Sequence, residues 1–100
     1  MVLHGIDFPA KPIAEFCRAN RIRRLALFGS ILRDDFAPHS DIDVLVEFEP
    51  ETRIGLRFFS LQEELSRLLG RQVDLHTPGF LGKRFRNQVL SEAAVQYESN

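Results

Sequence analysis

The amino-acid sequence predicts a small α/β (α+β) protein, in which a mixed sheet of about three main strands carries helices on one face. Segments with helical spacing of apolar residues alternate along the chain with segments of extended character. Hydrophobic residues make up 44% of the sequence and include nine Phe, which is enough apolar mass for a packed core. Because 100 residues is a typical domain size, we expect residues 1–100 to fold as a single domain.

The chain up to residue 36 is expected to form a helix, a strand and a short helical turn. In residues 12–20 a proline suits the first helical turn, and apolar side chains follow at helical spacing. Residues 25–28 are a short apolar run that predicts a buried strand, and this run ends at the turn-forming pair Gly29-Ser30. Residues 31–36 have room for one or two helical turns, with Ser30 at the position of an N-cap.

Residues 42–48 show the clearest strand pattern in the sequence. Apolar and polar residues alternate there with the two-residue period of a half-buried strand. One face holds Ile42, Val44, Val46 and Phe48, and the other holds Asp41, Asp43, Leu45 and Glu47. We expect the first set to face the helices and the second set to lie on a face left free for chemistry.

The rest of the chain is expected to add a helix, a strand and a last helix. A stripe of apolar side chains at helical spacing covers residues 58–69, and Gly70 suits the position after a helix C-terminus. Residues 72–76 are the third expected strand, with Asp74 on the face opposite its apolar neighbours. After a turn, an apolar side chain recurs at every fourth position over residues 81–89 and predicts the last helix.

Two carboxylates stand at positions i and i+2 at the start of the clearest strand. Asp is disfavoured in strands, yet Asp41 and Asp43 share one face here, with Cα atoms about 6–7 Å apart. Like charges at this spacing repel unless a cation lies between them, and Mg²⁺ takes carboxylate and phosphate oxygens as ligands. Asp74 stands in a similar setting, and if its strand lies beside residues 42–48, three carboxylates converge on the open side of the sheet. They can hold two Mg²⁺ ions, or one of them can accept a proton from an attacking hydroxyl. The alternative to a metal site is that Asp41 caps the start of the strand and Asp43 is exposed to solvent without a function.

A phosphate-binding element is predicted at Gly29-Ser30, ten residues before the first acid. Glycine lets the backbone approach a phosphate closely, while a helix N-terminus and the Ser hydroxyl supply hydrogen-bond donors. Arg33 follows one turn later and can reach the same phosphates, or it can form an ion pair with Asp34 or Asp35. A phosphate-binding turn next to metal-binding acids is the minimum equipment for phosphoryl or nucleotidyl transfer.

The G-S-x10-D-I-D stretch within residues 28–47 resembles the signature of the polymerase-beta-like nucleotidyltransferases. Asp74 matches the usual third acid of that superfamily. In element order and length, nearly the whole chain is similar to the minimal nucleotidyltransferase (MNT) group. One departure is Asp34, because relatives often have Gly after the residue that corresponds to Arg33.

The resemblance implies Mg²⁺-dependent transfer of a nucleoside monophosphate, commonly AMP from ATP, to a hydroxyl group with release of pyrophosphate. It implies that Gly29 and Ser30 hold the triphosphate, that Asp41 and Asp43 hold the metal ions, and that Asp74 is the catalytic base or a shared metal ligand. Members of the MNT group are frequently encoded beside a small helical HEPN-domain toxin, for which they serve as antitoxin, and the acceptor in that group is a tyrosine of the toxin, which is AMPylated. We therefore expect ATP as substrate, two Mg²⁺ ions as cofactors and a HEPN-domain toxin as partner.

Composition restricts the other partners. Thirteen Lys and Arg against fourteen Asp and Glu give a net charge of -1, which provides no general attraction for nucleic acid. With no membrane-length apolar run and no signal-peptide pattern, we expect a cytoplasmic protein without a membrane partner. Cys17, the single cysteine, is expected to be a buried thiol. A domain this small has little room for an enclosed pocket, and we therefore expect a second protein to complete the site. A homo-oligomer is a further possibility.

Other functions remain open at this point. A binding module without activity can neutralise a partner by occlusion, and nucleotidyl transfer can be directed to an RNA end or to a small molecule such as an aminoglycoside. The basic groups in residues 21–24 and 83–86 are expected on solvated faces, with the triphosphate, RNA or an acidic partner as alternatives. The histidines lack zinc-site spacing, and His39 merits a test because it is next to the acids. The pair Phe58-Phe59 has one apolar side chain more than a core stripe needs and is a candidate partner contact.

Overall fold

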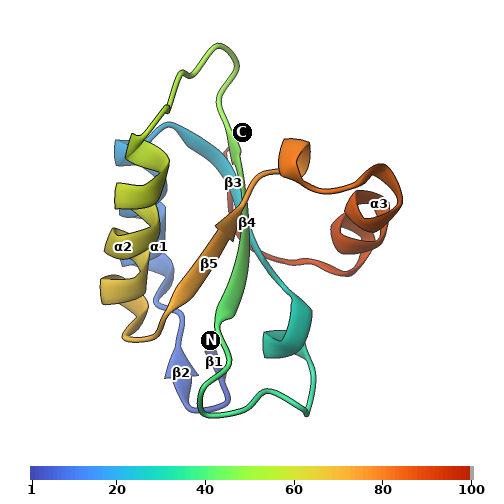
Figure 1. Ribbon diagram of the computed structural model, residues 1–100. Helices are drawn as coiled ribbons and strands as arrows, with labels where there is room; N and C mark the ends of the chain where they lie inside the picture. The colour runs from blue at the N-terminus through green and yellow to red at the C-terminus, as the bar shows by residue number, and fades with distance from the viewer. Residues whose placement is uncertain (100) are drawn as a thin grey trace.

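In the computed structural model, a four-stranded mixed sheet lies between helices (Figure 1). The structure describes residues 1–99. The strands of this sheet are β3 (Ile22–Phe28), β4 (Ile42–Phe48), β5 (Val73–His76) and β6 (Ala94–Glu98). Their spatial order is β5-β4-β3-β6, in which β4 and β5 are parallel and the other pairs are antiparallel. The predicted class, a small α/β protein with a mixed sheet, is confirmed.

The remaining elements are three helices, two 3-10 turns and an N-terminal hairpin. The helices are α1 (Ala10–Ala19), α2 (Arg57–Leu69) and α3 (Lys83–Glu92). The 3-10 turns are η1 (Gly29–Leu32) and η2 (Pro78–Phe80), and the hairpin pairs β1 (Val2–Leu3) with β2 (Ile6–Asp7). Within residues 1–99, no helix combines the length and the apolar character needed to cross a membrane.

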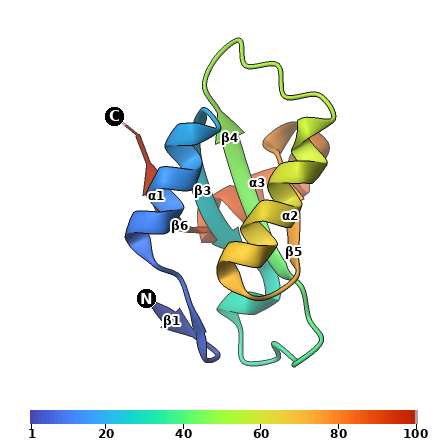
Figure 2. The same cartoon turned by 90° about the vertical axis from the view of Figure 1, so that its left-hand side faces the viewer.

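Helices α1 and α2 lie side by side on one face of the sheet (Figure 2). The alternation in β4 and β5 turns every second side chain toward them, as predicted. The main core contains Ile42, Val44 and Val46 of β4, Val73 and Leu75 of β5, and Ile13, Phe16, Cys17, Leu61 and Leu65 of the helices. Burying one such side chain stabilises the fold by about 1.5–3 kcal/mol, and this face holds the larger of the two buried clusters.

The ends of α1 and α2 are fixed by specific residues. At the end of α1 the buried Asn20 donates its side-chain amide to the Phe16 carbonyl at 2.8 Å and accepts from Arg57 of α2 at 2.9 Å. Gly70 ends α2 in the left-handed conformation with φ 70°, and its N–H donates to the Ser66 carbonyl. This is the C-terminal glycine that the sequence predicts.

The second face of the sheet is partly covered by α3. The sequence predicts helices on one face, and the structure adds α3 on the other (Figure 1). There Val89 packs with Phe28 and Leu45 in a second, smaller core. Leu45 is the apolar residue between Asp43 and Glu47 on this face, and α3 removes it from water. The polar part of the face stays open beside the helix.

Several elements differ in extent from the sequence prediction. Strand β3 begins at Ile22, so Arg23 and Arg24 belong to the strand and Arg21 precedes it. The expected helical turns over residues 31–36 are instead the single turn η1, and its N-cap is Phe28 rather than Ser30. No side chain caps η1. Strand β6 and the hairpin β1–β2 were not predicted at all.

Candidate active site

The parallel pairing of β4 with β5 places two of the predicted acids side by side. Asp43 is the register partner of Asp74, and both side chains lie on the face opposite α1 and α2. Asp43 is half-buried, with 29% of its side chain exposed, whereas Asp74 is 52% exposed. The sheet therefore holds one carboxylate inside the site and presents the other to solvent.

A histidine that the sequence analysis passed over completes this cluster. His76 lies two residues after Asp74 on β5, and its Nε2 is 3.1 Å from Asp74 Oδ2 and 3.6 Å from Asp43 Oδ1. Its ring packs edge-on against Phe28 of β3, with ring centroids 5.2 Å apart. A search for histidines spaced as in zinc sites misses His76. The signal was its i+2 position after an acid in a strand, because such residues share a face.

The electrostatic environment of Asp43 is set by burial and by charged neighbours. Burial raises the pKa of its carboxyl group above the ordinary value for Asp. His76 lowers the pKa, and the carboxylates of Asp74 and Asp41 raise it. A cation bound between these acids would relieve both the loss of hydration and the repulsion, so the site favours a bound positive charge.

Gly29 lies directly against Asp43 at the end of β3. Its φ of 76° is in the left-handed region that favours glycine. A Cβ atom added at this position would overlap Asp43 Oδ2 and stand 3.3 Å from Asp43 Cγ. The turn therefore requires glycine for two reasons, the backbone conformation and the space that the carboxylate needs.

A cavity of about 290 Å³ opens between η1 and α3 on this face of the sheet. Its walls are formed by Phe28, Gly29, Ser30, Arg33, Asp43, Phe85, Gln88, Val89 and Glu92. The three residues predicted to contact phosphate thus lie beside the inner acid. Arg33 also forms an ion pair with Asp35, with 3.3 Å between Nε and Oδ1, and both side chains are exposed. Such a surface pair is weak, so Arg33 is free to turn toward an anionic ligand.

Asp41 stands at the edge of the arrangement. It precedes the first residue of β4, and its side chain is exposed. It does not contribute to the group of ligand atoms formed by Asp43, Asp74 and His76 in the described part of the chain. The strand period that turns Asp43 into the site does not hold Asp41 there, because Asp41 lies outside the hydrogen-bonded strand.

The donor atoms of the site fit a divalent metal ion. One ligand atom from each of Asp43, Asp74 and His76 lies within 4.8 Å of the other two. His76 Nε2 is buried and has no hydrogen-bond partner of good geometry, so it is available as a ligand. Carboxylate oxygens suit Mg²⁺ and Mn²⁺, and the imidazole nitrogen suits transition metals.

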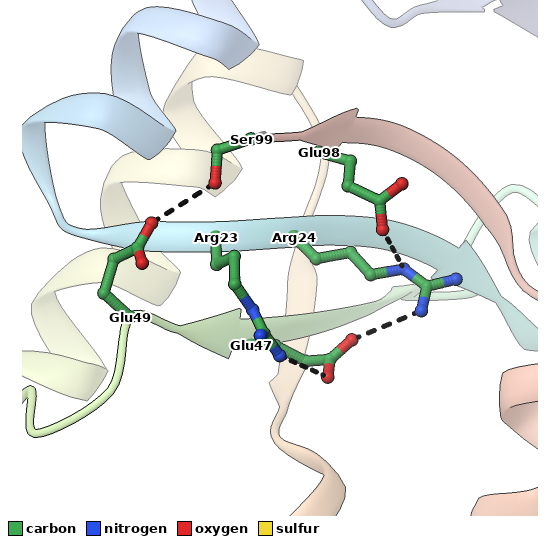
Figure 3. Close-up of polar contacts among 6 residues, drawn as sticks. All are labelled: Arg23, Arg24, Glu47, Glu49, Glu98 and Ser99. Carbon is green, nitrogen blue, oxygen red and sulfur yellow. Dashed lines mark hydrogen bonds and ion pairs between the residues drawn. The ribbon is translucent and has the colours of Figure 1, made fainter.

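At the far end of the same face, acidic side chains neutralise the first basic group. Glu47 forms ion pairs with Arg23 at 3.4 Å and with Arg24 at 3.5 Å (Figure 3). Arg24 also lies 3.7 Å from Glu98 of β6. Arg23 and Arg24 therefore belong to an ion-pair network that connects β3, β4 and β6.

The fold and the acids beside the Gly-Ser turn are those of a nucleotidyltransferase. A family model of the nucleotidyltransferase domain matches residues 11–95. The protein adenylyltransferase MntA of Thermococcus cleftensis is 39% identical over 71 residues, which are 71% of this chain and 71% of that protein. The chain therefore belongs to the nucleotidyltransferase family, as the sequence motif predicted.

Solved structures agree with this assignment. A structure described provisionally as a minimal nucleotidyltransferase is 34% identical, with a TM-score of 0.71 over 84% of this chain and 85% of its own. A chain in the complex of a tri-AMPylated HEPN toxin with an MNT antitoxin from Shewanella oneidensis has a TM-score of 0.64 at 22% identity, covering 90% of this chain and 70% of its own. At that identity the second match shows a shared fold.

Proposed function

We propose that this protein transfers AMP from ATP to a hydroxyl group of a partner protein, with a tyrosine of a HEPN-domain toxin as the acceptor. It would then act as the antitoxin of the pair. The observation that carries the proposal is the placement of Asp43 and Asp74 on one face of the sheet, beside the turn of Gly29 and Ser30. AMP as the transferred group is supported by the adenylyltransferase relative from Thermococcus cleftensis. The HEPN partner is supported by the fold shared with the Shewanella oneidensis complex.

The residues at the cavity divide the binding of the nucleotide between them. The open turn at Gly29 and Ser30 lets backbone N–H groups and a hydroxyl approach the triphosphate. Arg33 lies on the same wall and neutralises part of the phosphate charge. The acids would hold divalent metal ions, proposed as two Mg²⁺, which supply charge neutralisation and polarisation of the phosphate oxygens.

The transfer itself requires a base for the acceptor hydroxyl. The hydroxyl oxygen forms a bond to the α-phosphorus of ATP while the bond from that phosphorus to pyrophosphate breaks. We propose the more exposed acid, Asp74, as the base: it would bind metal through Oδ2, the oxygen nearest His76, and accept the hydroxyl proton on its other oxygen, which an acceptor arriving from solvent can reach. The inner acid, Asp43, stays ionised as a metal ligand. Asp41, exposed before β4, is proposed to join as the third carboxylate once nucleotide is present.

The test combines the purified chain with a HEPN-domain toxin, ATP and Mg²⁺, and follows the intact mass of the toxin together with pyrophosphate release. We expect the toxin to gain one or more AMP groups on tyrosine. The variants Asp41→Asn and Asp43→Asn should abolish this gain. Asp7→Asn is the matched control, because that exposed acid pairs with the N-terminal amine and lines neither the cavity nor the metal-ligand cluster of the described residues.

The outcomes separate the proposed activity from its alternatives. Transfer that survives both Asn variants contradicts the proposed site. An unmodified toxin held in a tight complex favours a binding module that acts by occlusion. Labelling of an RNA end or a small hydroxylated molecule in place of the toxin keeps the chemistry and changes the acceptor.

A further inference from the structure

We infer that His76 binds the metal ion directly, together with Asp43 and Asp74, and that this donor set makes the site prefer Mn²⁺ over Mg²⁺. The inference depends on the proposed function only for the presence of a divalent ion in the site. It adds a nitrogen ligand that neither the acid motif of the sequence nor the three-carboxylate prediction contains.

The interatomic distances match those between ligands of one ion. Metal bonds of about 2.0–2.2 Å place neighbouring ligand atoms about 3 Å apart. His76 Nε2 lies 3.1 Å from Asp74 Oδ2 and 3.6 Å from Asp43 Oδ1. Small rotations of the side chains therefore bring all three atoms to a shared ion, without any change in the pairing of β4 with β5.

The sheet positions the histidine, and its Nε2 is directed at the two carboxylates. Strand periodicity places it on the same face as Asp74, and the register of β4 with β5 places it opposite Leu45. The ring of Phe28 packs against the imidazole and limits its rotation. Nε2 is buried beside both carboxylates without a hydrogen bond of good geometry to either, so an ion between the three atoms would give each of them a ligand bond.

The kind of ligand decides the preference between the two ions. Mg²⁺ takes oxygen ligands and gives up its water reluctantly, so a nitrogen ligand adds little to its affinity. Mn²⁺ accepts carboxylate oxygens equally well, and imidazole is a ligand that suits first-row transition metals. Exchange of His76 for an oxygen ligand should therefore weaken Mn²⁺ binding and leave Mg²⁺ binding little changed.

The experiment measures metal binding on the full chain, with neither ATP nor toxin present. Nitrogen couplings in electron spin-echo envelope modulation spectra of bound Mn²⁺ report a histidine ligand directly. Calorimetric titrations with Mn²⁺ and with Mg²⁺ give the two affinities. The variant His76→Asn, which replaces nitrogen by an amide oxygen at similar size, should lose the nitrogen coupling and bind Mn²⁺ at least about tenfold more weakly. His39→Asn is the matched control, because His39 is exposed and outside the cluster.

Each result bears on the inference. Absence of a nitrogen coupling in the wild-type protein overturns it without any variant, so the test does not depend on the folding of His76→Asn. A coupling that survives His76→Asn and disappears in His39→Asn also overturns it, as does an equal loss of Mn²⁺ and Mg²⁺ affinity. A wild-type coupling that only His76→Asn removes supports it, even if the protein transfers no AMP. Failure of the proposed function is seen separately, in the mass of the toxin.

Discussion

Replacement of Gly29 by alanine should damage both the fold and the active site, because the added methyl group strains the backbone and displaces Asp43. The residue has φ 76°, and the new Cβ would overlap Asp43 Oδ2. Gly70 offers a matched control, since its φ is 70° and an added Cβ there meets nothing within 4 Å. The two variants share the backbone cost and differ in the contact with the carboxylate.

The expected magnitudes follow from these geometries. A left-handed alanine costs about 1–2 kcal/mol, so both variants should lose stability, with Tm lower by about 4–8 °C for each kcal/mol. In Gly29→Ala the Asp43 carboxylate must also move by about 1 Å to reach ordinary contact, and a shift of that size in a catalytic group costs about 100-fold in rate. Gly70→Ala, at the far end of α2, should keep the wild-type rate.

Thermal melts and urea titrations give the stability of each variant, and calorimetric titration with Mn²⁺ or Mg²⁺ gives the effect on the site. AMP transfer to the toxin adds the kinetic readout. The reasoning is refuted if Gly29→Ala binds metal and transfers AMP as the wild type does. It is also refuted if Gly70→Ala loses the same activity, because backbone strain alone would then explain the loss.

Charged and buried side chains give three further expected outcomes. Glu47→Ala removes the less exposed acidic partner of Arg24 and should lower the free energy of unfolding by about 1–2 kcal/mol in urea titrations. Glu98→Ala removes the more exposed partner and should lower it by less than about 1 kcal/mol. Equal losses would contradict the idea that burial makes the Glu47 pair the stronger one. Burial raises the pKa of the Cys17 thiol to about 12, so a thiol reagent should react only after unfolding, and rapid labelling of the native protein would contradict this. Because the pKa of Asp43 is raised in the folded protein, the stability of the fold falls as pH rises above the ordinary pKa of Asp. Without metal, Asp43→Asn should therefore have a higher Tm than the wild type at neutral pH, and the difference should vanish in acid. An unchanged Tm at neutral pH would contradict the raised pKa.

Strand periodicity made the central part of the fold predictable. In β4 the two-residue alternation assigns Val44 to the core and Asp43 to the open face, and the structure has both there. The same argument places Asp74 on the open face of its own strand, so the two acids were expected to meet if the two strands were neighbours. The parallel register that sets them opposite each other is a tertiary feature, fixed by the packing of α2.

Weak local signals explain the missed strands. Strand β6 (Ala94–Glu98) contains Val95 and Tyr97, but its Ala, Gln and Glu residues have low strand propensity, and its pairing with β3 supplies what the sequence lacks. The hairpin β1–β2 has strands of two residues each. Its turn residues His4 and Gly5 both have positive φ, as a tight hairpin turn requires, and Gly5 was the one sign of this turn in the sequence.

The position of α3 and the role of His76 could be seen only in the tertiary structure. Periodicity predicts that α3 has an apolar stripe, yet it does not say which face of the sheet the stripe covers. Leu45, apolar among acids, was the clue that part of the second face needed cover. His76 became visible as a neighbour of Asp43 only when β4 and β5 were paired.

The parallel contact between β4 and β5 has a consequence for how the chain folds. An antiparallel hairpin can zip up from its turn, but this pair cannot form until residues 49–72, including α2, have crossed over the sheet. Closing so long a segment is an entropic barrier, so we expect Asp43 and Asp74 to meet late in folding. An ion that bridges them binds only the completed crossover, and its stabilisation therefore slows unfolding without speeding folding.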